Sequence, residues 1–303
     1  MQTPTAASDV FAIDTQGSTG DGKAPTFRSS FPVDMAMRVD TDEANTEIAA
    51  RLQQGKWLVT ATTAAEASAN SSVFDFNNGW YSATSTISTY HGLMWARARG
   101  YFDVVCYDGS NSNRTFNHSL GVAHEMIWVK KRSDTRRWRV FIPALSGILK
   151  LNEDGAMTTN DAKSYFGDNN NIISPTATQF TVTEGVGDVN YSGDTYIAYL
   201  FATVANVSKV GSFTQSGATN VACGFTGSTP ALIILKRTDD TGDWYLFDST
   251  RGIVAGNDKS KYLNTNAAQI TNADVVDPYS GGFATTSSLT NGDYLFYAIA
   301  SIA

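Results

Sequence analysis

The sequence predicts an all-β fold made of three tandem antiparallel β-sandwich units of about 100 residues each. Three observations predict it. The chain repeats its own pattern of short apolar strands, polar turn sequences separate those strands, and no βαβ alternation occurs along the 303 residues. Hydrophobic residues make up 42% of the chain and charged residues 17%, with 25 glycines, which is typical of folded β structure with many turns.

The internal repeat is clearest between the middle and the last third of the chain. DVVCYDG and then HEMIWVKKRSDTRRWRVF, which begins at His124, return as KVGSFTQ and PALIILKRTDDTGDWYLF. The spacing is constant, so that Trp138 aligns with Trp244 and Lys130 with Lys236. After one insertion LNEDGA matches LNTNAA, and the copies end on YIAYLFA and YLFYAIA. We therefore predict a second unit over residues 99–205 and a third over residues 206–303.

A divergent first unit with an N-terminal arm is predicted over residues 1–98. DVFAID, FPVDMAMRV and YHGLMWA resemble the strands of the later units, but this part lacks a counterpart of Trp138 and Trp244. It carries DEANTEIAARLQQG instead, where a Thr41 cap and a Gly55 stop predict a short helix over residues 42–54. Because the linkers between units are short, we expect the units to pack in a fixed geometry.

Hairpins are predicted inside the second and third units. Ile127 and Val129, and then Trp138 and Val140, alternate with the period of a β-strand, and the polar turn SDTRR separates the two runs. TDDTGD separates ILKR from WYLF in the same way. Each unit thus supplies about seven or eight short strands, enough for two packed sheets.

The charge of the chain argues against nucleic acid as a partner. The formal net charge is -7, which repels phosphate backbones. One basic cluster brackets a hairpin; it consists of Lys130, Lys131, Arg132, Arg136, Arg137 and Arg139. A local anion-binding patch is one interpretation, but a solvated strand edge is favoured, and no function is assigned to the cluster.

Cysteine content and hydropathy set further expectations. Cys106 and Cys223 are too few for a disulfide framework and are expected to be buried free thiols. No run approaches the ~18 apolar residues of a membrane helix, and the N-terminus MQTPTAASD does not resemble a secretory signal. We expect no membrane insertion and synthesis in the cytoplasm of the cell that makes the protein.

Residues that could carry catalysis are sparse. His91, His118 and His124 have no counterparts in other units, and we interpret them as ordinary surface or turn histidines. No GxSxG, HExxH, CxxC or phosphate-binding glycine loop is present. The sequence therefore predicts no enzyme, no catalytic residues and no cofactor.

One polar loop resembles an oxygen-ligand calcium loop. Asp188, Asn190, Ser192 and Asp194 alternate in GDVNYSGDTY, but Tyr199 stands where an EF-hand loop would place its glutamate. A polar β-turn is the favoured interpretation, and no metal site is predicted.

Aromatic residues divide into repeated and unrepeated ones. Residues that recur across units are expected to pack in the core; these are the pair Trp138 and Trp244, and the set Trp80, Phe180 and Phe283. Residues without counterparts are better candidates for stacking on sugars or anchoring a protein partner; these are Trp57, Tyr165, Tyr191 and Tyr279.

Several strings resemble a repeated β-domain family of unknown function. RARGYFDVVCYDG, HSLGVAHEMIWVKKRS and SGDTYIAYLFA are similar to sequences of domains that occur in virion proteins, such as tail fibres and appendages, of tailed phages of marine bacteria and cyanobacteria. The resemblance implies a jelly-roll or lectin-like β fold and carries over no catalytic residue. His124 stands where that family usually has a proline, which the third unit keeps as Pro230.

The resemblance favours a structural role in a virion. We expect a protein of the tail or fibre apparatus that docks on other virion proteins, with host surface glycans or a receptor as further partners, and the resemblance implies a homo-oligomer. A capsid decoration or surface knob protein is the second hypothesis. A carbohydrate-active or sugar-binding enzyme accessory is the third, which a cleft with two carboxylates would favour.

Overall fold

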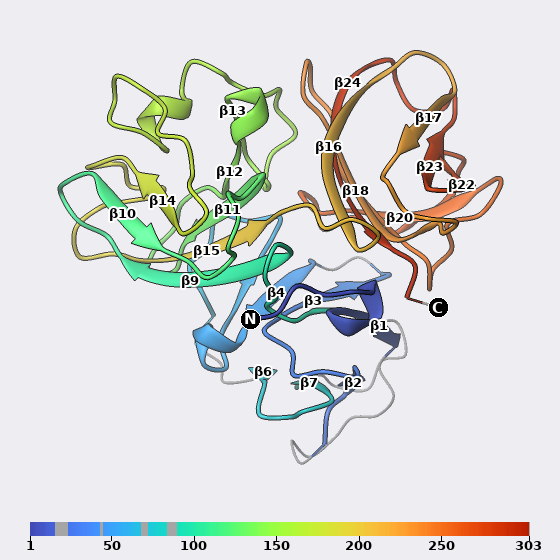
Figure 1. Ribbon diagram of the computed structural model, residues 1–303, viewed down its shortest axis with the longest axis horizontal. Helices are drawn as coiled ribbons and strands as arrows, with labels where there is room; N and C mark the ends of the chain where they lie inside the picture. Colours follow the sequence, from blue (N-terminus) through green and yellow to red (C-terminus); the bar gives the residue numbers. More distant parts are fainter. Residues whose placement is uncertain (16–23, 43–44, 68–71, 84–89, 303) are drawn as a thin grey trace.

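The protein is built from β-strands, as a computed structural model shows (Figure 1). The structure describes residues 1–15, 24–42, 45–67, 72–83 and 90–302. Within these ranges it contains twenty-four strands, four short 3-10 turns and no α-helix. Every strand pairing is antiparallel, so the all-β prediction is confirmed. None of the described helical turns is long and apolar enough to cross a membrane.

The first segment, residues 1–98, forms one five-stranded sheet and one three-stranded sheet. Its 3-10 turns are η1 (Ala7–Asp9) and η2 (Arg51–Gln53). The large sheet has the order β1 (Phe11–Thr15), β8 (Tyr90–Trp95), β3 (Met35–Asp40), β4 (Glu47–Ala50) and β5 (Trp57–Val59). The small sheet has the order β2 (Phe27–Arg28), β7 (Gly79–Ser82) and β6 (Ser72–Val73).

The second segment, residues 99–205, has the same kind of large sheet. Its order is β9 (Phe102–Asp108), β15 (Thr195–Phe201), β11 (Met126–Lys131), β12 (Arg139–Ile142) and β13 (Gly147–Leu149). A two-stranded sheet consists of β10 (Arg114–Asn117) and β14 (Gln179–Val182), and the 3-10 turns are η3 (Pro143–Leu145) and η4 (Ala162–Ser164).

The third segment, residues 206–303, repeats this order and adds one edge strand. Its large sheet runs β16 (Ser208–Gln215), β24 (Gly292–Ala300), β18 (Pro230–Arg237), β19 (Trp244–Asp248), β20 (Asp258–Tyr262) and β21 (Ile270–Ala273). The small sheet runs β17 (Thr219–Ala222), β23 (Gly282–Thr285) and β22 (Val276–Tyr279). In all three segments the opening strand therefore pairs with the closing strand, which pairs in turn with the next long strand.

Each small sheet covers one face of its large sheet. In the first segment Phe27 and Trp80 of the small sheet share a buried cluster with Ala36 and Met94 of the large one. In the second segment, the corresponding buried cluster joins β14 to the large sheet. Its members on the large sheet include Ile127 and Val129 of β11, and Tyr196, Ala198 and Leu200 of β15. This arrangement is sandwich-like because apolar side chains alternate to face a second sheet.

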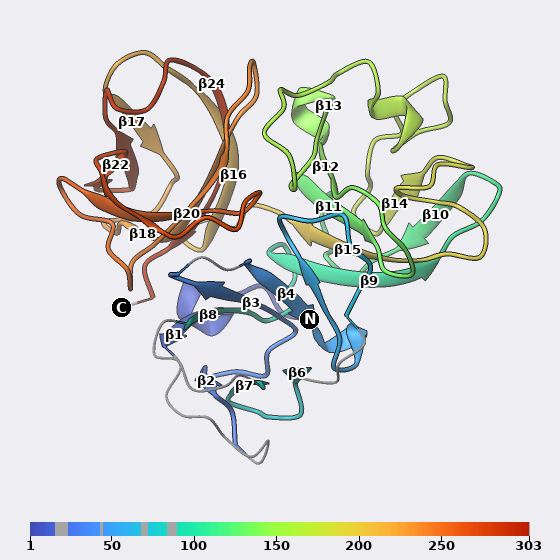
Figure 2. The same ribbon diagram turned by 180° about the vertical axis from the view of Figure 1, so that it is seen from behind.

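The opposite faces of the three large sheets meet in one shared core. Met126 and Trp128, which alternate with Ile127 and Val129 along β11, belong to a single buried cluster that extends from Ala7 to Ala300. Phe201 of the second segment lies 5.1 Å from Tyr297 of the third, between ring centroids. Figure 1 shows the first segment below the other two, and Figure 2 shows the same grouping from behind.

The repeated tryptophan and lysine of the second segment bind the first segment. The Trp138 Nε1–H donates to the Val59 carbonyl at 3.0 Å, and the Lys130 ammonium donates to the Thr63 carbonyl at 3.3 Å. Both side chains are fully buried, and burial lowers the pKa of Lys130 to about 8. These residues are therefore contacts between segments as well as core residues.

The third segment binds the second in the same way. The Trp244 Nε1–H donates to the Lys150 carbonyl at 2.9 Å, and the Lys236 ammonium donates to the Asp154 carbonyl at 3.0 Å. The two junctions are equivalent because the donors occupy matching positions of the repeat.

The junction between the third and first segments closes the ring with a different lysine. Lys261 of β20 donates to the Asp42 carbonyl at 2.8 Å. One backbone hydrogen bond of 2.9 Å recurs at each of the three junctions; its donor–acceptor pairs are Glu66 to Arg132, Met157 to Thr238 and Gln269 to Thr41. The three segments thus close on one another in a quasi-threefold ring.

The helix predicted over residues 42–54 is wrong for the part that the structure describes; residues 43–44 lie outside the described ranges. Residues 47–50 form β4 between β3 and β5, and only the turn η2 follows, ended by Gln54 in the left-handed region with φ 53°. Ile48 and Ala50 face the shared core while Ala49 faces the small sheet, so the segment is buried on both faces. Tertiary packing outweighs the helix propensity of EIAARLQ.

Two further predictions are confirmed. The hairpins pair Ile127 with Phe141 and Leu235 with Tyr245. The recurring aromatic residues are all buried; they are Trp80, Trp138, Phe180, Trp244 and Phe283. Both cysteines are free thiols; Cys223 is buried, as predicted, whereas Cys106 is only partly buried, with its Sγ 3.9 Å from the Leu52 carbonyl oxygen.

Candidate functional site

An open polar pocket of about 470 Å³ lies on the second segment. Two sequence-distant pieces form it, the turn after β11 and the loop before β15. Charged or polar side chains and one aromatic ring line it, together with the bare backbone of Gly185, Gly187 and Gly193; the side chains are Lys131, Asp134, Arg136, Tyr191, Ser192 and Asp194. It combines an aromatic ring with hydrogen-bond donors and acceptors, the groups that a polar ligand with one apolar face can use.

A buried ion pair anchors one wall of this pocket. The Lys131 ammonium lies 2.6 Å from a carboxylate oxygen of Asp194, and their side chains are 5% and 15% exposed. The Ser133 hydroxyl donates to the other Asp194 oxygen at 3.0 Å. These contacts tie the turn after β11 to the start of β15, so the wall is held before any ligand arrives.

Two exposed charges stand at the rim. Asp134 is 60% exposed and contacts Lys131 at 3.3 Å, and Arg136 is 49% exposed and reaches Asp188 only at 3.9 Å. The backbone N–H of Thr135 and the Lys131 ammonium lower the pKa of Asp134. The Asp134 carboxylate and the Arg136 guanidinium therefore keep free hydrogen-bonding capacity toward solvent.

Tyr191 supplies the aromatic surface. It is 51% exposed, the largest exposed fraction of any tyrosine or tryptophan among the described residues. Its backbone N–H donates to the Tyr196 hydroxyl at 3.1 Å, and that hydroxyl donates to the Gly187 carbonyl at 3.0 Å. The ring is thus presented outward from a fixed backbone.

The glycines of the loop leave the pocket open. Gly185 and Gly193 have φ of +68° and +87°, a region that favours glycine, and a Cβ at either would meet no atom within 4 Å. The backbone conformation at these two positions is one that glycine adopts without strain, and open space remains beside both.

The loop that resembles a calcium site uses its oxygen atoms within the protein. Asp188 pairs with Arg139 at 2.6 Å, and Asp194 pairs with Lys131. The Asn190 side chain accepts from the Ser110 N–H at 2.7 Å. No group of three metal-binding side chains occurs among the described residues, and these contacts fit the polar-turn interpretation.

The interpretation of the basic cluster as a solvated strand edge is wrong for half of its members. Lys130, Lys131 and Arg139 are buried, because β11 and β12 lie inside the large sheet with neighbours on both sides. Arg139 also lies over the ring of Tyr165 at 4.1 Å. Backbone carbonyls at the junction and acidic loop residues, which are distant in sequence, provide the partners that allow this burial.

His118 and His124 lie in the turn region between β10 and β11, as predicted, but both are buried rather than on the surface. Their rings lie 6.3 Å apart, and each contacts Phe180. Burial lowers the pKa of His124 to about 3, so it stays neutral. His91 is partly buried on β8, where burial also lowers its pKa.

The other unrepeated aromatics do not join the pocket lining. Tyr165 is partly buried beneath Arg139, and Trp57 is partly buried on β5. Tyr279 is 38% exposed on the edge strand β22 of the third segment. Tyr191 is therefore the one of the four that the structure brings together with polar groups in the pocket.

The aligned place in the third segment has a different lining. Arg237, which aligns with Lys131, pairs with Asp239 at 2.8 Å, and Gly242 aligns with Arg136. A Cβ at Gly292 would lie 2.7 Å from the Asp239 carboxylate, so little space remains. The departure of YSGDTY from LTNGDY in the repeat was the sequence signal for this difference.

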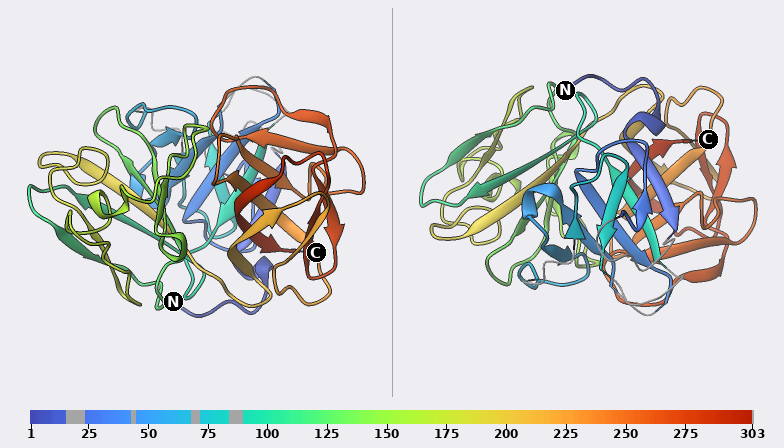
Figure 3. Two further views of the ribbon diagram at one scale, coloured as in Figure 1. Left: turned by 90° about the horizontal axis from the view of Figure 1, so that it is seen from above. Right: turned by 90° about the horizontal axis from the view of Figure 1, so that it is seen from below.

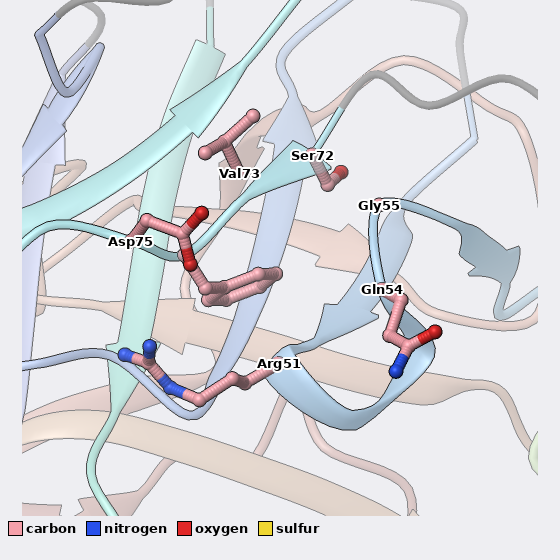
Figure 4. Close-up of a pocket in the computed structure, with 7 residues that line it drawn as sticks. Arg51, Gln54, Gly55, Ser72, Val73 and Asp75 are labelled. Carbon is pink, nitrogen blue, oxygen red and sulfur yellow. The ribbon is translucent and has the colours of Figure 1, made fainter.

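A second pocket of about 410 Å³ lies on the first segment (Figure 4). Arg51 lines it, but its guanidinium already donates to Asp34 at 3.2 Å and to the Val33 carbonyl at 2.7 Å. Ser72 at its edge follows residues 68–71, which lie outside the described ranges. Its main cation is thus engaged, and the pocket on the second segment is the better candidate.

One family model matches the chain. It is described as a domain of unknown function, DUF7483, and it matches residues 29–301, so the chain belongs to this family. No curated protein matches the chain.

Proposed function

We propose that this member of the DUF7483 family is a structural protein of a phage virion, in the tail or fibre apparatus. It docks on other virion proteins, and it contacts glycans on the host surface. The support is the similarity of strings such as SGDTYIAYLFA to domains of tail fibres and appendages. The role is non-enzymatic, and the protein is made in the host cytoplasm and resides in the virion.

The proposal includes an architecture of three tandem antiparallel β-sandwich units with a jelly-roll or lectin-like fold. The units are residues 1–98, 99–205 and 206–303. The recurrence of one strand order in the three large sheets, each accompanied by a small sheet, supports it. Jelly rolls and related sandwiches are frequent in capsid and lectin domains.

The observation that carries the proposal is the shared core. One buried cluster joins all three segments, and hydrogen bonds cross each of the three junctions. A block in which every segment is held by two others resists local opening, because no segment can detach without exposing apolar surface. Such rigidity suits a component that stays assembled outside the cell.

A capsid decoration or surface knob protein is the second candidate. The described residues form a compact block of three segments around a common centre, as the views from above and below show (Figure 3). Their longest strand has nine residues, Gly292–Ala300, so the described part presents a knob rather than a shaft. This shape favours a location at the tip of a fibre or on the shell.

A cryo-EM reconstruction of the particle, with mass spectrometry of purified particles, tests the proposal. We expect density for this block at the tail, in few copies around the tail axis. Density that follows the capsid lattice would instead establish the decoration role. Absence of the chain from purified particles would overturn both. Light scattering of the isolated protein measures whether it forms the homo-oligomer that the resemblance implies.

A further inference from the structure

We propose that the pocket on the second segment binds a neutral pyranose sugar, with Tyr191 as the stacking surface. This inference rests on the proposed contact with host glycans, and it assigns that contact to one place. Three features of the pocket support it: the exposed ring, the donor and acceptor side chains beside it, and the balance of charge.

The exposed ring of Tyr191 fits the apolar face of a sugar. The C–H groups on one face of a pyranose are weakly positive, and the face of an aromatic ring is weakly negative. A half-exposed tyrosine on a fixed backbone can stack on such a face with little loss of side-chain entropy. Stacking also removes apolar surface of the ring from water, which favours binding.

The rim offers a hydrogen-bond acceptor and a donor two residues apart in sequence. The Asp134 carboxylate can accept a hydrogen bond from a sugar hydroxyl, and the Arg136 guanidinium can donate one to a hydroxyl oxygen. Both side chains are about half exposed or more. Vicinal hydroxyls of a sugar each donate and accept, so a carboxylate and a guanidinium satisfy them together. The buried Lys131–Asp194 pair fixes the wall from which both project.

The charges of the lining are balanced. Lys131 and Arg136 are opposed by Asp134 and Asp194, and the neighbouring Asp188 is neutralised by Arg139. A sulfated or carboxylated sugar would meet the exposed Asp134, so the lining gives an anion no net attraction. Neutral hexoses are therefore the class that this lining fits.

The described part of the third segment does not repeat this lining. The aligned place in the third segment has Arg237 paired with Asp239 and no aromatic ring, so we expect one sugar per chain. A single open site of this kind is expected to bind a monosaccharide with a dissociation constant on the order of 1 mM.

Ligand-observed saturation-transfer NMR with methyl glycosides of glucose, mannose, galactose and N-acetylglucosamine tests the proposal on the full chain. We expect transfer to at least one of them. Tyr191→Phe keeps the stacking ring and should bind like the parent, whereas Tyr191→Ala should weaken binding about 10-fold. Tyr279→Ala removes an exposed tyrosine elsewhere and should change nothing. A thermal melt of each variant confirms that it is folded.

Three results would overturn the proposal. They are no transfer to any of the four glycosides, equal binding by Tyr191→Ala and the parent, or binding only of N-acetylneuraminic acid that 0.5 M salt (about a 4 Å screening length) abolishes. None of these concerns the location of the protein, which the particle reconstruction measures. Sugar binding by a chain that is absent from particles would refute the virion role and leave the pocket assignment standing.

Discussion

Replacing Trp244 by alanine should destabilise the protein at the junction of the second and third segments. The indole is fully buried in the shared core, and its Nε1–H donates to the Lys150 carbonyl. Emptying a large aromatic site costs about 3 to 5 kcal/mol of unfolding free energy. Loss of a hydrogen bond contributes about 1 kcal/mol, which places the expected value in the upper part of that range.

The matched control is Trp80→Ala. Trp80 is also buried, but it packs between the two sheets of the first segment, and its Nε1–H has no hydrogen-bond partner among the described residues. Both variants lose the same atoms. Only Trp244→Ala removes a bond that joins two segments.

Urea denaturation followed by circular dichroism measures the loss of stability, and hydrogen exchange of the amides at the junction locates it. The Met157 N–H donates to the Thr238 carbonyl, and the Gly242 N–H donates to the Asp154 carbonyl. We expect both amides to lose protection in Trp244→Ala and to keep it in Trp80→Ala. Unchanged protection in a destabilised Trp244→Ala would refute the role of the indole between segments.

Two further predictions concern buried ionisable groups. Burial lowers the pKa of His124 to about 3, so below about pH 6.5 the unfolded chain takes up a proton that the folded chain does not, and stability falls. Between pH 6.5 and 4.5 the parent should lose about 2 to 3 kcal/mol more than His124→Leu in urea titrations, and parallel curves would contradict this. Arg251→Met should cost about 3 to 5 kcal/mol, because it leaves the buried Asp248 carboxylate unpaired. Adding Asp248→Asn should recover part of that loss in thermal melts, and no recovery would argue against the charge as its cause.

Much of the strand pattern could be predicted from the sequence. Period-two alternation and polar turns identified both hairpins, and recurrence across copies identified Trp138 and Trp244 as core residues. These features depend on local backbone preferences and on one buried face, which a single strand's sequence carries. Tyr191 was found as a candidate because the repeat has no counterpart for it.

The second buried face was decided by tertiary structure alone. Lys130 follows the strand alternation of a surface residue, yet it is buried in the junction, where its ammonium donates to the Thr63 carbonyl of the first segment and to the Lys131 carbonyl. The sequence of residues 47–50 fits a helix, but these residues form the strand β4, because one face of the strand packs in the shared core and the other against the small sheet. No local sequence pattern predicts which distant segment packs against a strand.

The candidate pocket is also formed by tertiary contacts. The turn that holds Asp134 and Arg136 is separated in sequence from the loop that holds Tyr191 by β12, β13 and β14. The ion pair of Lys131 with Asp194 brings the turn and the loop together. The sequence by itself determined the strands, the repeat and the residues that needed burial. The closing of three segments around one core determined which faces became interior, because burial depends on what the rest of the chain places opposite each strand.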